Sequence, residues 1–192
     1  MPELAEVEAA RRFAEHHLKG LKIDKAVTQP DTIVFPDGAE KAIPRKLKGR
    51  TVTACKRKGK HMWFELDQRP WPTLHFGMTG DFKVYGDTSE RPKFWKLELQ
   101  MSEGTYFAMI NKRRLGRIRL LNDPENEPPI SALGFDPYLD MPSTATFQSL
   151  VERRKTPVKA LLLDQGFAAG VGNWLADDIL YQAGIDPRRK AS

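Results

Sequence analysis

The chain has 192 residues, a length that suits one large domain or one domain with a smaller module and excludes a peptide or a multidomain array. Hydrophobic residues make up 40% of it and charged residues 29%, which excludes a disordered or fibrous protein. The single cysteine, Cys55, excludes an internal disulfide and a multi-cysteine zinc site. Acids near the amino terminus are unlike an export signal, and no apolar run approaches the roughly 18 residues of a membrane span. We therefore expect an intracellular protein with no membrane partner.

The first predicted element is a helix over residues 3–18, where apolar residues recur at spacings of three and four and Gly20 follows as a stop. Between residues 51 and 121 the pattern changes to short β-type runs separated by glycine, proline and aspartate. This texture predicts mostly antiparallel strands, over residues 51–55, 61–66, 82–85, 95–100, 106–110 and 117–121.

The last third of the chain predicts a separate helical unit. Prolines interleaved with acids follow the final strand, and we place the boundary between two domains, 1–125 and 140–192, in this connector. Beyond it, helical spacing indicates two helices over residues 156–165 and 171–183, joined by the glycine-containing segment 166–170. This arrangement resembles a helix-turn-helix hairpin.

The positive charge is concentrated in three windows that contain no acid: residues 56–60, 112–119 and 153–159. Together they contribute +13 against a chain total of +6, so the remainder carries −7. Cationic patches on an acidic background indicate a polyanionic partner, since each neutralised phosphate releases a counterion. Nucleic acid is the leading class of partner, and lysines that merely solubilise strands and helix ends are the alternative for any one window.

Pro2 follows Met1 and would become a free secondary amine once the initiator methionine is removed. An α-amino group has a pKa of about 8, against about 10.4 for lysine, so a larger neutral fraction is available to attack an electrophilic carbon. Glu3 and Glu6 lie close enough in sequence to serve as general acid or base. Alternatively, proline and the two acids simply begin a helix.

Several motifs in order resemble the formamidopyrimidine-DNA glycosylase family, and they cover almost the whole chain. The last of them look most like the plant and fungal branch. The motifs are Met1-Pro2-Glu3-Leu4-Ala5-Glu6-Val7-Glu8, Arg57-Lys58-Gly59-Lys60, His75-Phe76-Gly77-Met78-Thr79-Gly80, Lys112-Arg113-Arg114-Leu115-Gly116, Leu133-Gly134, Lys159 to Gln165 and Gly170-Val171-Gly172-Asn173-Trp174.

The resemblance implies an α+β fold: an amino-terminal helix with an antiparallel β-sandwich, then part of a helix-two-turn-helix module. It implies a base excision repair enzyme that removes oxidised purines such as 8-oxoguanine and formamidopyrimidines and then cuts the strand at the abasic site. The expected partner is double-stranded DNA with oxidised or abasic sites, without a cofactor or metal. We expect a monomer, located in the nucleus if the source is eukaryotic.

The resemblance also implies roles for four catalytic residues. The nitrogen of Pro2 would attack the sugar C1′, displace the base and form an iminium that acts as an electron sink for phosphate elimination. Glu3 would shuttle the proton at the sugar, and Glu6 would support the same site. Lys60 matches a hairpin lysine that contacts phosphate and assists proton transfer, although a hairpin lysine is otherwise usually a solvated charge.

A damaged base must leave the duplex stack, and three residues match the family's wedge for the vacancy. Met78 and Leu115 would unstack bases, and Arg113 would reach the orphaned partner base. Leu115 departs from the usual aromatic, so stacking on the neighbouring base would be lost. Without the family, Met78 and Leu115 would be interpreted as core residues at strand ends.

Four further residues match DNA contacts in the family. Asn173 would hold the backbone beside the lesion, although a plain helix cap would look identical in sequence. Lys155 and Lys159 match lysines near phosphate and lesion. His75 is a candidate phosphate contact, with a core position as the alternative.

Two departures from the family pattern leave rival functions open. Ala5 replaces the family's second proline, which relaxes the backbone beside the nucleophile. The sequence stops before the remaining helices and the β-hairpin finger of the pattern, so we expect that finger domain to be absent. The first rival is a non-catalytic module that binds damaged DNA, and the second is a small-molecule tautomerase that uses Pro2 as a base.

Overall fold

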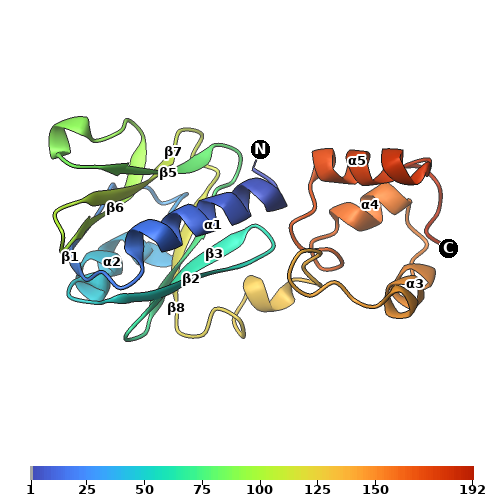
Figure 1. Cartoon of the computed structure of the whole chain (residues 1–192), viewed down its shortest axis with the longest axis horizontal. Helices are drawn as coiled ribbons and strands as arrows, with labels where there is room; N and C mark the ends of the chain where they lie inside the picture. The colour runs from blue at the N-terminus through green and yellow to red at the C-terminus, as the bar shows by residue number, and fades with distance from the viewer. Residues whose placement is uncertain (1) are drawn as a thin grey trace.

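The structure, a computed structural model, describes residues 2–192; Met1 and its expected removal lie outside the described residues. Two four-stranded antiparallel sheets with the orders β1-β6-β7-β5 and β2-β3-β4-β8 form a sandwich beside α1 (Figure 1). The first sheet comprises β1 (Ile23–Thr28), β5 (Gly80–Tyr85), β6 (Trp95–Met101) and β7 (Tyr106–Asn111). The second comprises β2 (Val52–Lys58), β3 (His61–Leu66), β4 (Trp71–His75) and β8 (Arg117–Leu121).

Helices lie at both ends of the described chain. The first two are α1 (Leu4–Leu18) and α2 (Ala39–Leu47), and the last three are α3 (Thr144–Glu152), α4 (Val158–Leu163) and α5 (Asn173–Ala183). The helices α3 to α5 form a separate unit beyond the amino-terminal end of α1 (Figure 1). The α+β fold expected from the sequence is therefore confirmed. Within residues 2–192, no helix combines the length and the apolar character needed to cross a bilayer.

The sandwich and the helical unit each have their own hydrophobic core. The inner faces of the two sheets bury aromatic and aliphatic side chains such as Phe64, Phe82 and Phe107, and α1 covers β2 with its apolar stripe. In the helical unit, Leu161, Phe167 and neighbouring apolar residues pack together.

Four of the helices and strands have no counterpart among the elements predicted from the sequence: β1, β4, α2 and α3. A proline inside α2 and another inside β4 argue against a helix and a strand, respectively. Pro72 of β4 is tolerated because β3 pairs with this strand only from Thr73 onward, so the missing N–H costs no bond to β3. The two carboxy-terminal helices are shorter than predicted, since α4 ends at Leu163 and α5 begins at Asn173.

Candidate active site

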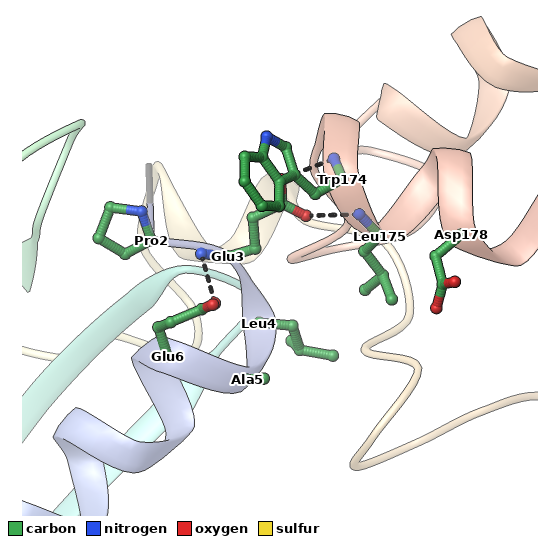
Figure 2. Close-up of a pocket in the computed structure, with 8 residues that line it drawn as sticks. All are labelled: Pro2, Glu3, Leu4, Ala5, Glu6, Trp174, Leu175 and Asp178. Atoms are coloured by element: carbon green, nitrogen blue, oxygen red, sulfur yellow. Dashed lines mark hydrogen bonds between the residues drawn. The ribbon is translucent and has the colours of Figure 1, made fainter.

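Pro2 is half-buried at the start of α1 and lines a cleft between the sandwich and the helical unit. The cleft has a volume of about 690 Å³. Residues before and within the first turn of α1 form one side, and the first turns of α5 form the other (Figure 2). The lining consists of Pro2, Glu3, Leu4, Ala5, Glu6, Trp174, Leu175 and Asp178.

Glu3 joins the two sides of this cleft. Its buried carboxylate accepts hydrogen bonds from the backbone N–H groups of Trp174 at 2.9 Å and Leu175 at 3.0 Å (Figure 2). It also accepts from the N–H of Gly172 at 3.1 Å. The backbone N–H of Glu3 in turn donates to Glu6 Oε2 at 3.0 Å. A carboxylate at a helix amino terminus satisfies donors that the helix itself leaves unpaired. Glu3 therefore fixes the position of Pro2 relative to α5.

A second cavity, of about 390 Å³, brings together four of the predicted site residues: Lys60, His75, Met78 and Asn173. Lys60 reaches it from the β2–β3 turn and donates from Nζ to the carbonyl of Val171 at 3.5 Å. Burial lowers the pKa of Lys60 below its usual range, while the nearby charges of Glu3 and Glu6 act in the opposite direction. Lys60 thus lies within the electrostatic reach of both glutamates.

His75 lies at the end of β4 and faces His61 across the β3–β4 pair, with ring centroids 4.6 Å apart. The Nδ1 atom of His75 accepts from the N–H of Gly77 at 3.1 Å, so the neutral ring carries its proton on Nε2. Burial lowers the pKa of His75 to about 4 and that of His61 to about 3, and nearby cations act in the same direction. Both rings are neutral near pH 7.

This histidine pair predicts that acid destabilises the protein. Unfolded histidine has a pKa of about 6.5, so below that pH the unfolded chain binds protons that folded His61 and His75 do not. Stability is therefore full above about pH 6.5 and falls as the pH drops toward 4. At pH 5 we expect a loss of about 2 kcal/mol for each histidine relative to pH 7.5. Urea unfolding at the two pH values measures this loss of stability. His61→Gln should reduce the difference in the free energy of unfolding between the two pH values. His16→Gln, at an exposed histidine, is the matched control.

Met78, Arg113 and Leu115 lie on two neighbouring loops, and all three are exposed. The interpretation of Met78 and Leu115 as core residues is wrong, because each exposes about two fifths of its surface. The N–H of Arg113 donates to Thr79 Oγ1 at 3.1 Å, which joins the two loops.

A buried asparagine, which the sequence reasoning missed, holds the same loops. Asn111 donates from Nδ2 to the carbonyl of Phe76 at 2.8 Å and accepts at Oδ1 from the N–H of Gly116 at 3.0 Å. An amide is suited to this position because it both donates and accepts. Only its placement at the end of a strand, directly before a basic loop, could have indicated it.

Of the three remaining predicted DNA contacts, one lies at a cavity, one is held in an ion pair and one lies away from both cavities. Asn173 is exposed as the first residue of α5, and the alternative that it is a plain cap is wrong, because Gly172 is the cap and Glu3 accepts the N–H bonds. Lys159 forms an ion pair with Asp177 at 2.6 Å. Lys155 is exposed between α3 and α4 and lines neither cavity, so the structure does not bring it to the site.

One member of the basic windows is structural. Arg57 is fully buried, donates to Glu8 at 3.0 Å and forms an ion pair with Asp136, so it cannot face a phosphate. Many of the other cations remain available to an anion. In the described chain, the lysines and arginines of the three basic windows that have no carboxylate oxygen within 4.0 Å are Lys56, Lys58, Lys60, Lys112, Arg113, Arg117, Arg153, Arg154 and Lys155.

Two family models match the chain. The model described as the formamidopyrimidine-DNA glycosylase N-terminal domain covers residues 1–118, and the model described as the formamidopyrimidine-DNA glycosylase H2TH domain covers residues 133–192. The chain belongs to the formamidopyrimidine-DNA glycosylase family. The two matched parts correspond to the sandwich with α1 and to the helical unit, so the two cavities lie where the two family domains meet.

Relatives in this family include proteins named formamidopyrimidine-DNA glycosylase from Arabidopsis thaliana and Geobacter metallireducens. The first is 38% identical over 205 residues and the second 35% identical over 198 residues, and both matches cover all of this chain. The chain spans 53% of the Arabidopsis protein and 71% of the Geobacter protein. It is therefore about half as long as the plant relative.

Solved structures of the family have the same fold. MutM in complex with DNA containing carbocyclic 8-oxo-G matches with a TM-score of 0.88 at 26% identity, over 99% of this chain and 71% of that one. Lactococcus lactis Fpg in complex with DNA containing an abasic site matches with a TM-score of 0.88 at 25% identity, over 99% of this chain and 70% of that one. These family members bind damaged DNA.

Proposed function

We propose that the chain is a DNA glycosylase and abasic-site lyase of base excision repair that acts on oxidised purines in double-stranded DNA. One observation carries the proposal: Pro2 and Glu3 lie at a cleft between the two family domains, with Lys60 and Asn173 in the adjoining cavity. The unpaired cations of the basic windows support a DNA partner.

In the proposed reaction, the neutral Pro2 nitrogen attacks C1′ of the damaged nucleotide. The bond from C1′ to the base breaks, and the base leaves with its electron pair and takes up the proton that the Pro2 nitrogen loses on bonding to C1′. The sugar ring then opens at O4′, which receives a proton from the Glu3 side of the site, and C1′ and the Pro2 nitrogen form a cationic iminium. A general base, assisted by Lys60, then removes a proton from C2′. The 3′ phosphate leaves with the electron pair of its C–O bond, and the strand is cut.

We also propose a role in DNA binding for each of the remaining site residues. Met78, Arg113 and Leu115 enter the vacated stack from their two exposed loops, and His75 and Asn173 contact phosphate beside the lesion. Lys159 contributes only after its ion pair with Asp177 opens, and Lys155 contacts DNA away from the cavities.

The organisation of the protein is part of this proposal. We propose that 1–125 and 140–192 act as the catalytic and DNA-clamping domains of a monomer. The plant and fungal resemblance favours the nucleus as its location. Fluorescence microscopy of the tagged chain in plant cells checks this, and an exclusively cytoplasmic signal would contradict it.

Borohydride trapping on abasic-site DNA tests the proposed chemistry. Reduction of the iminium should leave a covalent protein–DNA adduct, and Pro2→Gly should lower its yield by at least about 10²-fold because the secondary amine is lost. Mass spectrometry of the mature chain should show Pro2 as the first residue. DNA binding without an adduct would instead support the non-catalytic binding module, and salt-independent activity on a small molecule would support the tautomerase.

A further inference from the structure

Trp174 presents an almost free aromatic surface to the cleft that contains Pro2. It is the second residue of α5, and 84% of its surface is exposed. Its backbone is nevertheless held in place, because its N–H donates to Glu3 Oε1 at 2.9 Å. Figure 2 shows the indole projecting from the first turn of α5 on the side of Glu3 and Pro2. A large apolar ring that is fixed at its base but packs against little is more typical of a binding surface than of a core residue.

The rest of the cleft combines apolar walls with carboxylates. Leu4, Ala5 and Leu175 provide the apolar surface, and Glu6 and Asp178 are the acids beside Glu3. Asp178 Oδ2 accepts from Gln182 Nε2 at 3.0 Å, and within residues 2–192 no donor bonds to its Oδ1 atom. Ionised carboxylates only accept hydrogen bonds, so this wall favours a ligand whose edge carries N–H groups.

We propose that Trp174 and Asp178 form the subsite that receives the extruded nucleobase. The inference rests on the proposed function, which requires a base to leave the stack beside Pro2. The indole stacks on the face of the base, and Asp178 Oδ1 accepts a hydrogen bond from an N–H on its edge. A planar base with N–H donors fits this subsite, and a base that presents only lone pairs at that edge is repelled. Trp174 and Asp178 are thereby specificity-determining residues.

Two DNA duplexes of one sequence separate base reading from every other role of Trp174. One carries an oxidised purine and the other an abasic site, which has no base to stack. Trp174→Ala should lower the rate of base release by about 10-fold or more, while borohydride trapping on the abasic duplex changes by less than about 2-fold. Trp174→Phe should restore most of the loss because it retains an aromatic face. Equal losses on both duplexes would overturn the proposal.

The same helix offers a matched control for the tryptophan. Tyr181 is 86% exposed on α5 but does not line the Pro2 cleft. Tyr181→Ala should leave base release unchanged, and a loss equal to that of Trp174→Ala would contradict a specific subsite. Asp178→Asn places an amide where the acceptor lies, and it should lower base release by about 10-fold relative to abasic-site trapping. An unchanged ratio of base release to abasic-site trapping would show that Asp178 is not part of the subsite.

Failure of this inference is distinguishable from failure of the proposed function. If the unaltered chain gives no adduct with abasic DNA, the glycosylase and lyase proposal fails. The subsite can still be measured by binding, because affinity for the oxidised-purine duplex should exceed that for the abasic duplex and this difference should vanish in Trp174→Ala. Equal affinity of the unaltered chain for both duplexes would overturn the subsite by itself.

Discussion

Replacing Asp136 with alanine is expected to lower the free energy of unfolding by about 3–5 kcal/mol. Asp136 is buried in the connector between the two units, and its Oδ2 atom accepts from Arg57 and from the N–H of Gly59 at 2.8 Å. Its Oδ1 atom accepts from the N–H groups of Tyr138 at 3.0 Å and Leu139 at 3.2 Å. Removing one partner of a buried ion pair leaves the other charge uncompensated, which is the costly case. Urea denaturation at pH 7.5 measures the change.

An exposed ion pair provides the control for this prediction. Asp186 pairs with Arg188 at 3.0 Å, but both side chains are largely exposed, so Asp186→Ala should cost no more than about 1 kcal/mol. Because Asp136 also holds Gly59 in the turn that carries Lys60, the Asp136 variant should lose borohydride trapping at temperatures where it remains folded. A loss of stability similar to that of the Asp186 variant would show that the buried pair contributes little.

Replacing Glu3 with glutamine is expected to decouple α5 from the amino terminus and to lower borohydride trapping by about 10²-fold or more. The carboxylate accepts three backbone N–H bonds at the start of α5, and hydrogen bonds to a charged group are worth about 1.5–3 kcal/mol each. Glutamine keeps the shape but turns an N–H₂ group toward these donors. Hydrogen exchange of the Gly172, Trp174 and Leu175 amides should therefore accelerate, and mass spectrometry of exchanged peptides checks it.

A helix cap away from the cleft separates capping from coupling. Ser143 Oγ accepts from the N–H of Thr146 at 3.3 Å at the start of α3, and Ser143→Ala should cost about 1 kcal/mol without changing trapping. Unaltered exchange at the start of α5 in Glu3→Gln would contradict the coupling role. A fall in trapping without faster exchange would instead indicate that Glu3 acts only as a proton carrier.

Local patterning predicted much of the sandwich. The spacing of Leu4, Val7 and Leu18 predicted α1 to within one residue, because burial of one face repeats with the period of the helix. The strands β3 and β8 have the predicted bounds. Of the missed elements, α2 contains Pro44, β4 contains Pro72, β1 buries only two of six residues and α3 buries none. The strands β1 and β4 are stabilised by pairing with neighbouring strands rather than by their own composition.

The candidate site also combines features that the sequence indicated with features that only the structure shows. Pro2, Glu3 and Glu6 are close in the chain, so their chemistry could be argued from sequence, and the family motifs indicated Lys60 and Asn173. No local signal showed that Glu3 accepts hydrogen bonds from residues 169 and 171 positions away, or that Arg57, inside a basic window, is buried against Asp136. Arg57 is structural rather than available to a phosphate because two carboxylates surround it.

The amino-acid order alone determined the family, the main secondary-structure pattern and the types of reactive group that this protein carries, because these depend on short-range spacing and on motifs read in succession. Only the tertiary structure decided which charges are neutralised, which aromatic rings stay exposed and how Pro2 is positioned against α5. Those properties depend on contacts between distant segments, and burial changes both the cost of a charge and the strength of the hydrogen bonds around it.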